Sequence, residues 1–285
     1  MSTLAYQARG FTRGAETAGA WMLGLLWILP LAYAFWTAFH PGEFSTHFVP
    51  TAPLTLENFV KAWHAAPFAR YFLNTILLCT MVLAAQLVLC TLAAYAFARF
   101  RFKGRRMGML ALLLIQMFPT FLAVVAIYLI VLRIGDVFPS IGLDTRASVI
   151  LVGLGGALGI NTWLMKGFLD SIPDSLDESA RVDGATPGQV FWGIILPLAT
   201  PVLAVVGLLS YIFSINEFII ASRLLQTTDK WTLPVGLYGF ISDKYASQWG
   251  PFCAGVVLAA LPVVILFFFL QRYITEGLTR GAVKG

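Results

Sequence analysis

Long apolar runs separated by short polar connections are the main pattern along the chain. A helix needs about 20 apolar residues to cross the hydrocarbon core of a bilayer. Six runs meet that length and predict six spanning helices, at 18–39, 72–97, 107–132, 147–165, 199–221 and 251–270. The runs are continuously apolar and do not alternate, which excludes the strands of a membrane barrel. The pattern therefore predicts an all-α, polytopic membrane protein.

The composition excludes a soluble protein and a nucleic-acid-binding protein. Of the 285 residues, 59% are hydrophobic and only 12% are charged, and the mean hydropathy is +0.81. So few charges cannot coat a water-exposed surface of this size. The formal net charge of +5 comes from basic residues that lie beside the apolar runs, without an aromatic-lined groove. We therefore expect membrane lipids, and no nucleic acid, as their partners.

Three basic clusters predict the orientation of the chain. Arg9 and Arg13 precede the first run, five basic residues fall within 99–106, and the tail 272–285 follows the last run. Cytoplasmic connections carry an excess of Lys and Arg. With six spans, we expect one transmembrane domain over 1–285 with both termini cytoplasmic. The first run is longer than the apolar core of a signal peptide and lacks a cleavage site, so it should be retained.

Cysteine and histidine spacing does not indicate a metal site. Cys79, Cys90 and Cys253 lie inside apolar runs without CxxC spacing, which also gives no support for a disulfide. The three histidines are dispersed over one external connection. We therefore predict no metal site and expect the cysteines to be small residues facing the core or lipid.

The connection 167–197 is long and acidic, which membrane orientation does not require. Pro173 near its start and Gly184 as its stop predict a short helix over 171–184, in which Asp177 and Arg181 can support each other. Thr186 to Gln189 predicts a capping box and a second short helix that ends before Pro197. Small residues are expected to form a bare docking surface on the first helix: Ser179, Ala180, Gly184 and Ala185. On composition alone, a solvated amphipathic loop is the alternative.

The spacing within this connection resembles the EAA signature of ABC importer permeases. Glu178-Ser179-Ala180 is followed after three residues by Gly184, and after nine more by Ile194-Ile195-Leu196-Pro197. Ser179 is the one departure, because the pattern has Ala there. Further segments resemble the carbohydrate branch of the family, in particular the maltose-type second permease subunit: Leu56 to Phe59, Asn74-Thr75, Ala94 to Arg99, Asn216 to Phe218, and Glu276 to Gly285.

The resemblance implies a type I ABC importer permease fold in the bacterial inner membrane. It also implies a coupling helix seated on a cytoplasmic ATPase, with these contact residues: Glu178, Ser179, Ala180, Asp183, Gly184, Ile194, Leu196 and Pro197. The chain has no phosphate-binding loop, so ATP and Mg are expected in partner subunits and no cofactor in this chain. The implied partners are a second permease subunit, two copies of an ABC ATPase and an extracytoplasmic sugar-binding protein.

Polar residues within the spans are candidates for the translocation path or gate: Gln86, Tyr95, Gln116, Asn161, Ser210, Tyr211, Ser214, Asn216 and Glu217. Each alone is better explained by a hydrogen bond to a neighbouring helix. Glu217 is the acidic residue well inside a span, where carboxylates face a cavity or a partner. We favour a structural or gating role for it over sugar contact. Glycines in the fourth run predict close helix packing: Gly153, Gly155, Gly156 and Gly159.

Two further contacts are predicted outside the spans. The basic, glycine-containing tail is expected to reach the ATPases through Thr279, Arg280, Gly281 and Lys284, although an orientation signal explains it as well. The aromatic external connection 222–250 is expected to meet the sugar-binding protein near Gly236, Tyr238 and Gly239. Some of its rings would instead lie in the interfacial belt.

The predicted function is sugar import driven by ATP hydrolysis in partner chains, so this chain is not expected to be an enzyme. The tail favours maltose or maltodextrin, with trehalose or another disaccharide as the alternative. An ion-driven carrier would favour paired broken helices and more buried titratable groups. An intramembrane enzyme would need paired catalytic side chains within the spans, and the sequence shows no such pair.

Overall fold

The structure, a computed structural model, describes residues 2–42, 47–49, 51–242 and 248–282, with side chains described only between 16 and 274. Over these ranges the regular structure is helical, without a strand, which confirms the all-α prediction. The longer helices are α1 (Ser2–Phe39), α3 (Phe68–Arg99), α4 (Arg105–Gln116), α5 (Thr120–Val137), α6 (Arg146–Leu169), α10 (Thr200–Ile215) and α13 (Trp249–Ala282). The shorter ones are α2 (Glu57–Ala65), η2 (Pro139–Ile141), α7 (Asp174–Val182), α8 (Pro187–Val190), the π-helical η3 (Phe191–Ile195), α9 (Leu196–Leu198), α11 (Ile219–Leu224), η4 (Thr228–Lys230) and α12 (Leu233–Tyr238).

Several helices are long and apolar enough to cross a membrane. Within the described residues there are five of them: Glu16–Phe39, Phe68–Arg99, Thr120–Val137, Arg146–Leu169 and Trp249–Ile274. A sixth span results if Pro187–Leu198 and Thr200–Ile215, which meet at an angle of 72°, are counted as one broken span. The polytopic architecture is thus confirmed, and the number six depends on this bent pair.

Two of the predicted continuous helices are interrupted. The run 107–132 is divided, because α4 ends at Gln116 and α5 begins at Thr120. Pro119 stands between them in an extended conformation; it has no backbone N–H to donate and disfavours helix in the residue before it. The run 199–221 is likewise divided, since α10 ends at Ile215 and α11 starts only at Ile219.

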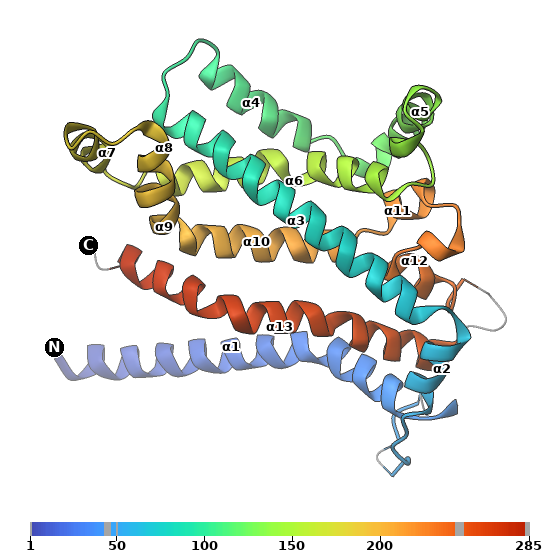
Figure 1. Ribbon diagram of the computed structural model, residues 1–285. Helices are drawn as coiled ribbons and strands as arrows, with labels where there is room; N and C mark the ends of the chain where they lie inside the picture. Colours follow the sequence, from blue (N-terminus) through green and yellow to red (C-terminus); the bar gives the residue numbers. More distant parts are fainter. Residues whose placement is uncertain (1, 43–46, 50, 243–247, 283–285) are drawn as a thin grey trace. The chain divides into compact units, whose positions relative to one another are not determined.

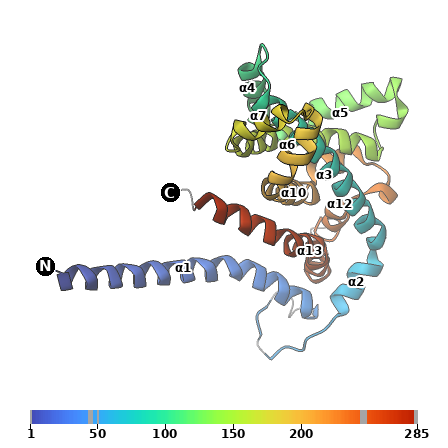
Figure 2. The same ribbon diagram turned by 60° about the vertical axis from the view of Figure 1, so that its left-hand side comes forward.

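The chain divides into two compact units, 1–66 with 237–258 and 67–236 with 259–285. In the second unit, α3 packs along α6 and both contact α10 (Figures 1 and 2). Helix α4 approaches α6 so closely that a Cβ on Gly159 would lie 2.4 Å from the carbonyl oxygen of Leu112. A Cβ on Gly153 would meet Val82 at 3.3 Å, whereas Gly155 has nothing within 4 Å. The predicted close packing is therefore confirmed at Gly159 and Gly153 but not at Gly155.

In the first unit, α2 is bound to the end of α1. The buried Asn58 donates hydrogen bonds from Nδ2 to the carbonyl oxygens of Thr37, Ala38 and His40, at 3.1, 3.2 and 2.8 Å. These carbonyls have no partner within a helix that is ending, so Asn58 stabilises the end of α1. Cys253 belongs to the small core next to this contact, and all three cysteines are buried and free.

Candidate functional site

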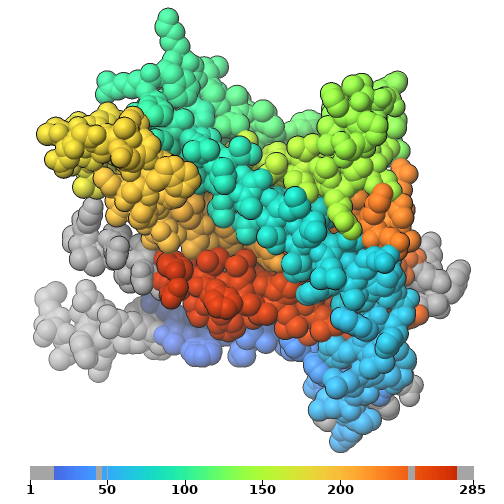
Figure 3. Space-filling model, viewed as in Figure 1, coloured from blue at the N-terminus to red at the C-terminus, as the bar shows by residue number. Residues whose placement is uncertain are grey.

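Helix α7 lies on the surface of the second unit and buries one face along its 9 residues. Asp177 and Ala180 are buried, and Ala180 packs into a core with Ile172, Val190 and Tyr95. In the space-filling view the yellow and amber surface of α7 to α9 stands at one end of the teal α3 (Figure 3). Contrary to the predicted docking surface, Ala180 therefore anchors the helix inward, and Ala185 also packs against this core.

A charged contact with the end of α3 fixes α7. The Arg99 guanidinium pairs through Nε with Asp177 Oδ2 at 2.6 Å and through Nη1 with Asp174 Oδ1 at 2.9 Å. Its Nη2 also donates to the carbonyl oxygen of Ile172 at 3.0 Å. The side chains of Arg99 and Asp177 are each only 6% exposed. The predicted support between Asp177 and Arg181 is therefore wrong, because Asp177 points inward to Arg99 whereas Arg181 is exposed.

The predicted stop and restart of the chain after α7 are confirmed. Gly184 has a φ of +85°, a left-handed conformation that a side chain would strain. The amide of Ala185 donates to the carbonyl oxygen of Ala180 at 2.9 Å and so closes the end of the helix. Thr186 and Gln189 then form the reciprocal hydrogen bonds of a capping box at the start of α8. Both features follow from local sequence.

The second short helix does not end before Pro197, as the sequence predicts. It continues through a π-helical turn at Phe191–Ile195 into α9, which contains Pro197. The amide of Leu196 bonds the carbonyl oxygen of Phe191, one residue further back than in an α-helix. This wider turn accommodates a proline, which has no N–H and would clash with the carbonyl four residues earlier. Ile194 and Leu196 are partly buried against the core around Ile195, so they hold the loop in place.

The outer face of α7 is a stripe formed by Ser175, Glu178, Ser179 and Val182, which are spaced as neighbours on one side of a helix. All four residues are exposed, and Val182 is exposed to 86%. We call this set the outer stripe. An exposed carboxylate beside an exposed valine makes a small amphipathic contact surface. Asp183, Gly184 and Pro197 are exposed but lie outside the stripe.

A cavity of about 600 Å³ lies among α3, α6, α10 and α11 in the second unit. It is lined mainly by apolar side chains, and five of the predicted path residues are on its wall: Gln86, Ser210, Ser214, Asn216 and Glu217. Thr75, which the sequence also indicated, adds a hydroxyl group, as do Thr120 and Thr232, which the sequence did not single out. Among the described residues that line the cavity, none is Lys or Arg.

Most of these polar side chains are engaged with the protein itself. Glu217 accepts hydrogen bonds from the amides of Ile220 and Ala221, at 2.6 and 2.8 Å, and so caps the start of α11. These hydrogen bonds agree with the structural or gating role that the sequence favours over sugar contact. Gln86 Nε2 donates to the carbonyl oxygen of Gly153 at 2.9 Å. The Oε1 atom of Gln86 has no hydrogen-bond partner among the described residues.

The other predicted path residues are not on the cavity wall. Asn161 donates to Ser210 Oγ at 2.7 Å, and Gln116 accepts from the amide of Ile160 at 2.9 Å. Tyr95 packs with Phe191 under α7, with ring centroids 4.8 Å apart. Tyr211 is buried in the core between α3 and α10. Their hydrogen bonds and packing account for these residues as links between helices, the alternative noted from sequence.

Comparison with known proteins decides the family. Residues 86–280 match the family described as binding-protein-dependent transport system inner membrane component. The galactooligosaccharides transport system permease protein GanQ of Bacillus subtilis (strain 168) is 34% identical over 268 residues, or 92% of each chain. The chain belongs to this family. The maltose/maltodextrin transport system permease protein MalG of Salmonella typhimurium is 41% identical over 219 residues, 77% of this chain and 73% of the relative.

Solved structures support the same fold. A bacterial ABC transporter chain involved in the import of alginate, an acidic polysaccharide, has a TM-score of 0.75 and 24% identity, covering 92% of this chain and 96% of that chain. The family match and the sequence relatives identify the protein as a carbohydrate ABC importer permease of the maltose type, a multi-pass subunit of the bacterial inner membrane that is not itself an enzyme.

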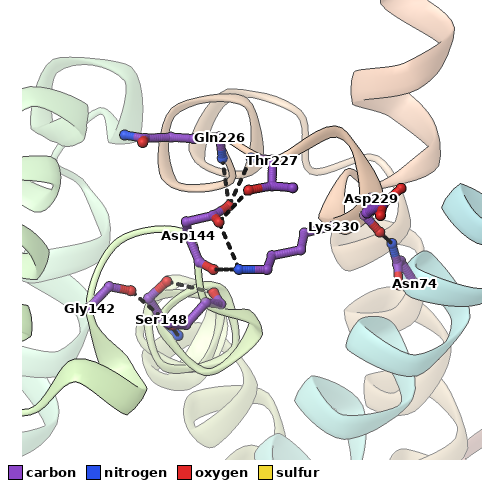
Figure 4. A network of polar contacts seen from close by, with 9 residues as sticks. Asn74, Gly142, Asp144, Ser148, Gln226, Thr227, Asp229 and Lys230 are labelled. Carbon is purple, nitrogen blue, oxygen red and sulfur yellow. Dashed lines mark hydrogen bonds and ion pairs between the residues drawn. The ribbon is translucent and has the colours of Figure 1, made fainter.

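This permease has a second polar cluster, around Asp144, that the sequence did not reveal (Figure 4). Asp144 has a φ of +58°, and its Oδ1 accepts from the amides of Gln226 and Thr227, both at 2.9 Å. Its Oδ2 accepts from Thr227 Oγ1 at 2.6 Å and from Lys230 Nζ at 2.7 Å. Burial opposes ionisation, but these donors outweigh it and hold the pKa of Asp144 well below its usual range.

The start of α3 is connected to the same segment. Asn74 Nδ2 donates to the carbonyl oxygens of Asp229 and Trp231, at 2.9 and 3.0 Å, and its Oδ1 accepts from Arg146 at 2.8 Å. Arg70 pairs with Asp229 at 2.5 Å. The resemblance at Asn74-Thr75 thus has a physical explanation, because Asn74 links α3 to η4 across more than 150 residues of sequence.

The remaining predicted contact residues are only partly placed. Gly236 is buried against Tyr71, where a Cβ would lie 2.2 Å from the ring, so this position supports packing and not docking. Tyr238 is 51% exposed, and Gly239 is also exposed. The predicted tail contacts Thr279, Arg280, Gly281 and Lys284 lie outside the residues whose side chains are described, and they stay a prediction.

Proposed function

We propose that this permease forms half of the translocation path for a neutral, maltose- or maltodextrin-like oligosaccharide and couples it to ATP hydrolysis in two separate ATPase subunits. A second permease and an extracytoplasmic sugar-binding protein complete the complex. The binding-protein-dependent family and its maltodextrin relatives support this assembly. One of the similar structures is an alginate ABC transporter in complex with a periplasmic protein that holds an alginate pentasaccharide.

The observation that carries the coupling role is the division of α7 into two faces. Arg99 and the core hold the inner face, while the outer stripe of Ser175, Glu178, Ser179 and Val182 is exposed. A helix that is fixed to the membrane domain on one side and free on the other is suited to transmit displacement. Glu178 is positioned to accept a charge-assisted hydrogen bond from a partner. We therefore assign α7 as the coupling helix and its outer stripe as the ATPase contact.

The cavity favours a neutral sugar over an acidic one. Its described polar lining consists of hydroxyl and amide groups and Glu217, whose two oxygens are both occupied by backbone amides. Without Lys or Arg on the wall, a polyanion such as alginate would lose hydration without gaining a counterion. The hydroxyls of a neutral oligosaccharide match the groups present. Trehalose, another disaccharide and a galactooligosaccharide are the competing substrates.

The coupling assignment is tested by Glu178→Ala in the complete complex. Truncating one partner of a buried charged contact costs about 2–5 kcal/mol, which weakens docking by roughly 30-fold to a few thousand-fold. We expect ATPase activity to become uncoupled from sugar uptake, with a normal yield of the membrane domain. Gly184→Val should act differently, by straining the left-handed stop and misdirecting α8.

The matched control is Ser179→Ala on the same stripe. Ser179 Oγ bonds only the carbonyl oxygen of Leu176 at 3.1 Å among the contacts of the described chain, and Ala is the residue of the EAA pattern. Near-normal uptake is expected. Normal coupled uptake by Glu178→Ala would refute the coupling assignment. Competition between maltotriose, trehalose, galactooligosaccharide and alginate oligosaccharide for uptake tests the substrate; preference for the acidic sugar would contradict the reading of the cavity.

A further inference from the structure

A second pocket, of about 660 Å³, lies in the second unit away from the cavity and the outer stripe. It is bounded by the end of α3, the first three turns of α4 and the last turns of α6. The wall is apolar, with two aromatic rings from the ends of α3 and α6, Phe97 and Trp163, and with Met109, Leu110 and Leu113 from α4.

The rim of this pocket is basic. Arg105, Arg106 and Lys166 line it, and no Asp or Glu is among its described lining residues. Arg105 uses one nitrogen for a long hydrogen bond, 3.4 Å, to the carbonyl oxygen of Ala98, and Lys166 pairs with Asp170. Between Arg99 and Arg133 the sequence contains no acidic residue. Asp170 offsets the charge of Lys166, so the excess of positive charge at the rim comes from Arg105 and Arg106.

The first turn of α4 adds to this charge. Gly104, Arg105, Arg106 and Met107 all line the pocket, and α4 has neither a side-chain cap nor an acidic residue in its first turn. The amides at the start of a helix lack carbonyl partners within it, and the helix dipole favours an anion there. The backbone and the arginine side chains thus prefer the same kind of ligand.

The combination of an apolar wall and a cationic rim selects the occupant. A free phosphate ion would match the rim but would leave the wall unused. An acidic protein surface would match the charge of the rim as well, but to reach it that surface would have to pass the apolar side chains of α4. A phospholipid supplies both parts, with acyl chains for the wall and a phosphate for the rim. Trp163, at 49% exposure, has the amphipathic ring that is typical of the headgroup level.

We propose that this pocket binds a phospholipid with an anionic headgroup. The phosphate is held by Arg105, Arg106 and Lys166, and an acyl chain packs against Leu110, Leu113 and Trp163. Basic pockets between transmembrane helices are suited to such headgroups. The proposal depends on the chain lying in a membrane and not on which sugar is carried or how α7 couples to the ATPases.

Native mass spectrometry of the purified, delipidated full-length permease complex tests the proposal by titration with phosphatidylglycerol and, separately, phosphatidylcholine. We expect a preferred phosphatidylglycerol adduct. In Arg105→Gln/Arg106→Gln its affinity should fall by about 30-fold, from the contribution of two basic residues at an anionic lipid. Because Arg105 also bonds Ala98, the single variant Arg106→Gln is included and should lose about fivefold. Arg105→Lys/Arg106→Lys should retain binding within a few-fold.

The control is Arg101→Gln/Lys103→Gln, which removes the same charge from the loop that precedes α4, outside the residues that line the pocket. It should change the affinity by less than twofold. An equal loss in the control, or equal affinity for phosphatidylcholine, would overturn the proposal. Displacement of the lipid by millimolar inorganic phosphate would assign the rim to a free anion. Loss of the adduct only when the ATPases are bound would assign the pocket to a protein partner.

Discussion

Replacing Arg99 with Met should release α7 from the end of α3 while leaving the membrane helices folded. The guanidinium contacts Asp177, Asp174 and the carbonyl of Ile172, and it and Asp177 are each only 6% exposed. Without Arg99, Asp177 remains a buried carboxylate with no counterion. Removing one partner of a buried pair costs about 3–5 kcal/mol. Since 1.4 kcal/mol corresponds to a factor of ten, the released population of α7 should rise by roughly a hundred-fold to a few thousand-fold.

Hydrogen exchange of the backbone amides measures this release directly. In Arg99→Met, amides of α7 should lose protection by about that factor, because local opening governs their exchange. Peptides from the middle of α6 serve as the internal reference and should exchange as in the wild type. Sugar uptake per ATP hydrolysed should fall in the same variant. Unchanged exchange of α7 in a folded Arg99→Met protein would refute the reasoning.

Three matched variants separate the buried pair from charge in general. Arg101→Met removes a neighbouring exposed charge and should leave α7 unchanged. Asp174→Asn removes the Nη1 contact, but Asp174 is 78% exposed, so the effect should stay below about 1 kcal/mol. Arg99→Met/Asp177→Leu removes both buried charges and should restore much of the protection lost in Arg99→Met, since no unpaired charge remains.

Two further predictions concern the rest of the second unit. Gly159→Ala should destabilise the protein by about 1–3 kcal/mol in thermal unfolding, because its Cβ would lie 2.4 Å from the carbonyl oxygen of Leu112. Gly155→Ala should be neutral or stabilising, because nothing lies within 4 Å of its Cβ. Equal melting temperatures of the two variants would contradict the close packing at Gly159. The pKa of Asp144 is depressed on folding, so its stabilising contribution is fully present above the unfolded value of about 4 and is lost progressively as the pH falls from there toward the folded pKa. Asp144→Asn tolerates the positive φ and should lower stability by up to about 1 kcal/mol at pH 7 and by clearly less near pH 2; the same deficit at both values would refute the ionic origin.

Features that depend on neighbouring residues in the sequence were predictable. The stop at Gly184 and the capping box at Thr186 are confirmed because a left-handed glycine and a reciprocal cap need only a few consecutive residues. The break at Pro119 belongs to the same class. It was missed because apolar length was weighed above a proline within the run, although the missing N–H is visible in the sequence.

Features that depend on which residues meet in space were not predictable from one sequence. Asp177 has a suitable partner four residues away in Arg181, and helix geometry alone favours that pair. The folded chain instead brings Arg99 to Asp177. Arg99 also donates to the carbonyl oxygen of Ile172, which is 73 residues away in the sequence. Burial decides between them, because the inner face of α7 needs a cation that the exposed Arg181 cannot supply. The Asp144 cluster was missed for the same reason, since it joins residues more than 80 positions apart.

Helix α3 connects the two polar clusters and so links α7 to the opposite end of the second unit. Its last residue, Arg99, holds α7, and near its first turns Asn74 holds the segment 229–231. At 1.5 Å per residue, a helix of 32 residues is about 48 Å long. A displacement of α7 is therefore expected to move α3 as a rigid rod and to be felt at Asn74. On its C-terminal side, α7 is connected to α10 through the π-helical turn and the 72° bend, and the chain can bend at this connection. The buried pair between Asp177 and Arg99 is the contact through which a displacement of α7 would reach α3, whereas the outer stripe stays exposed.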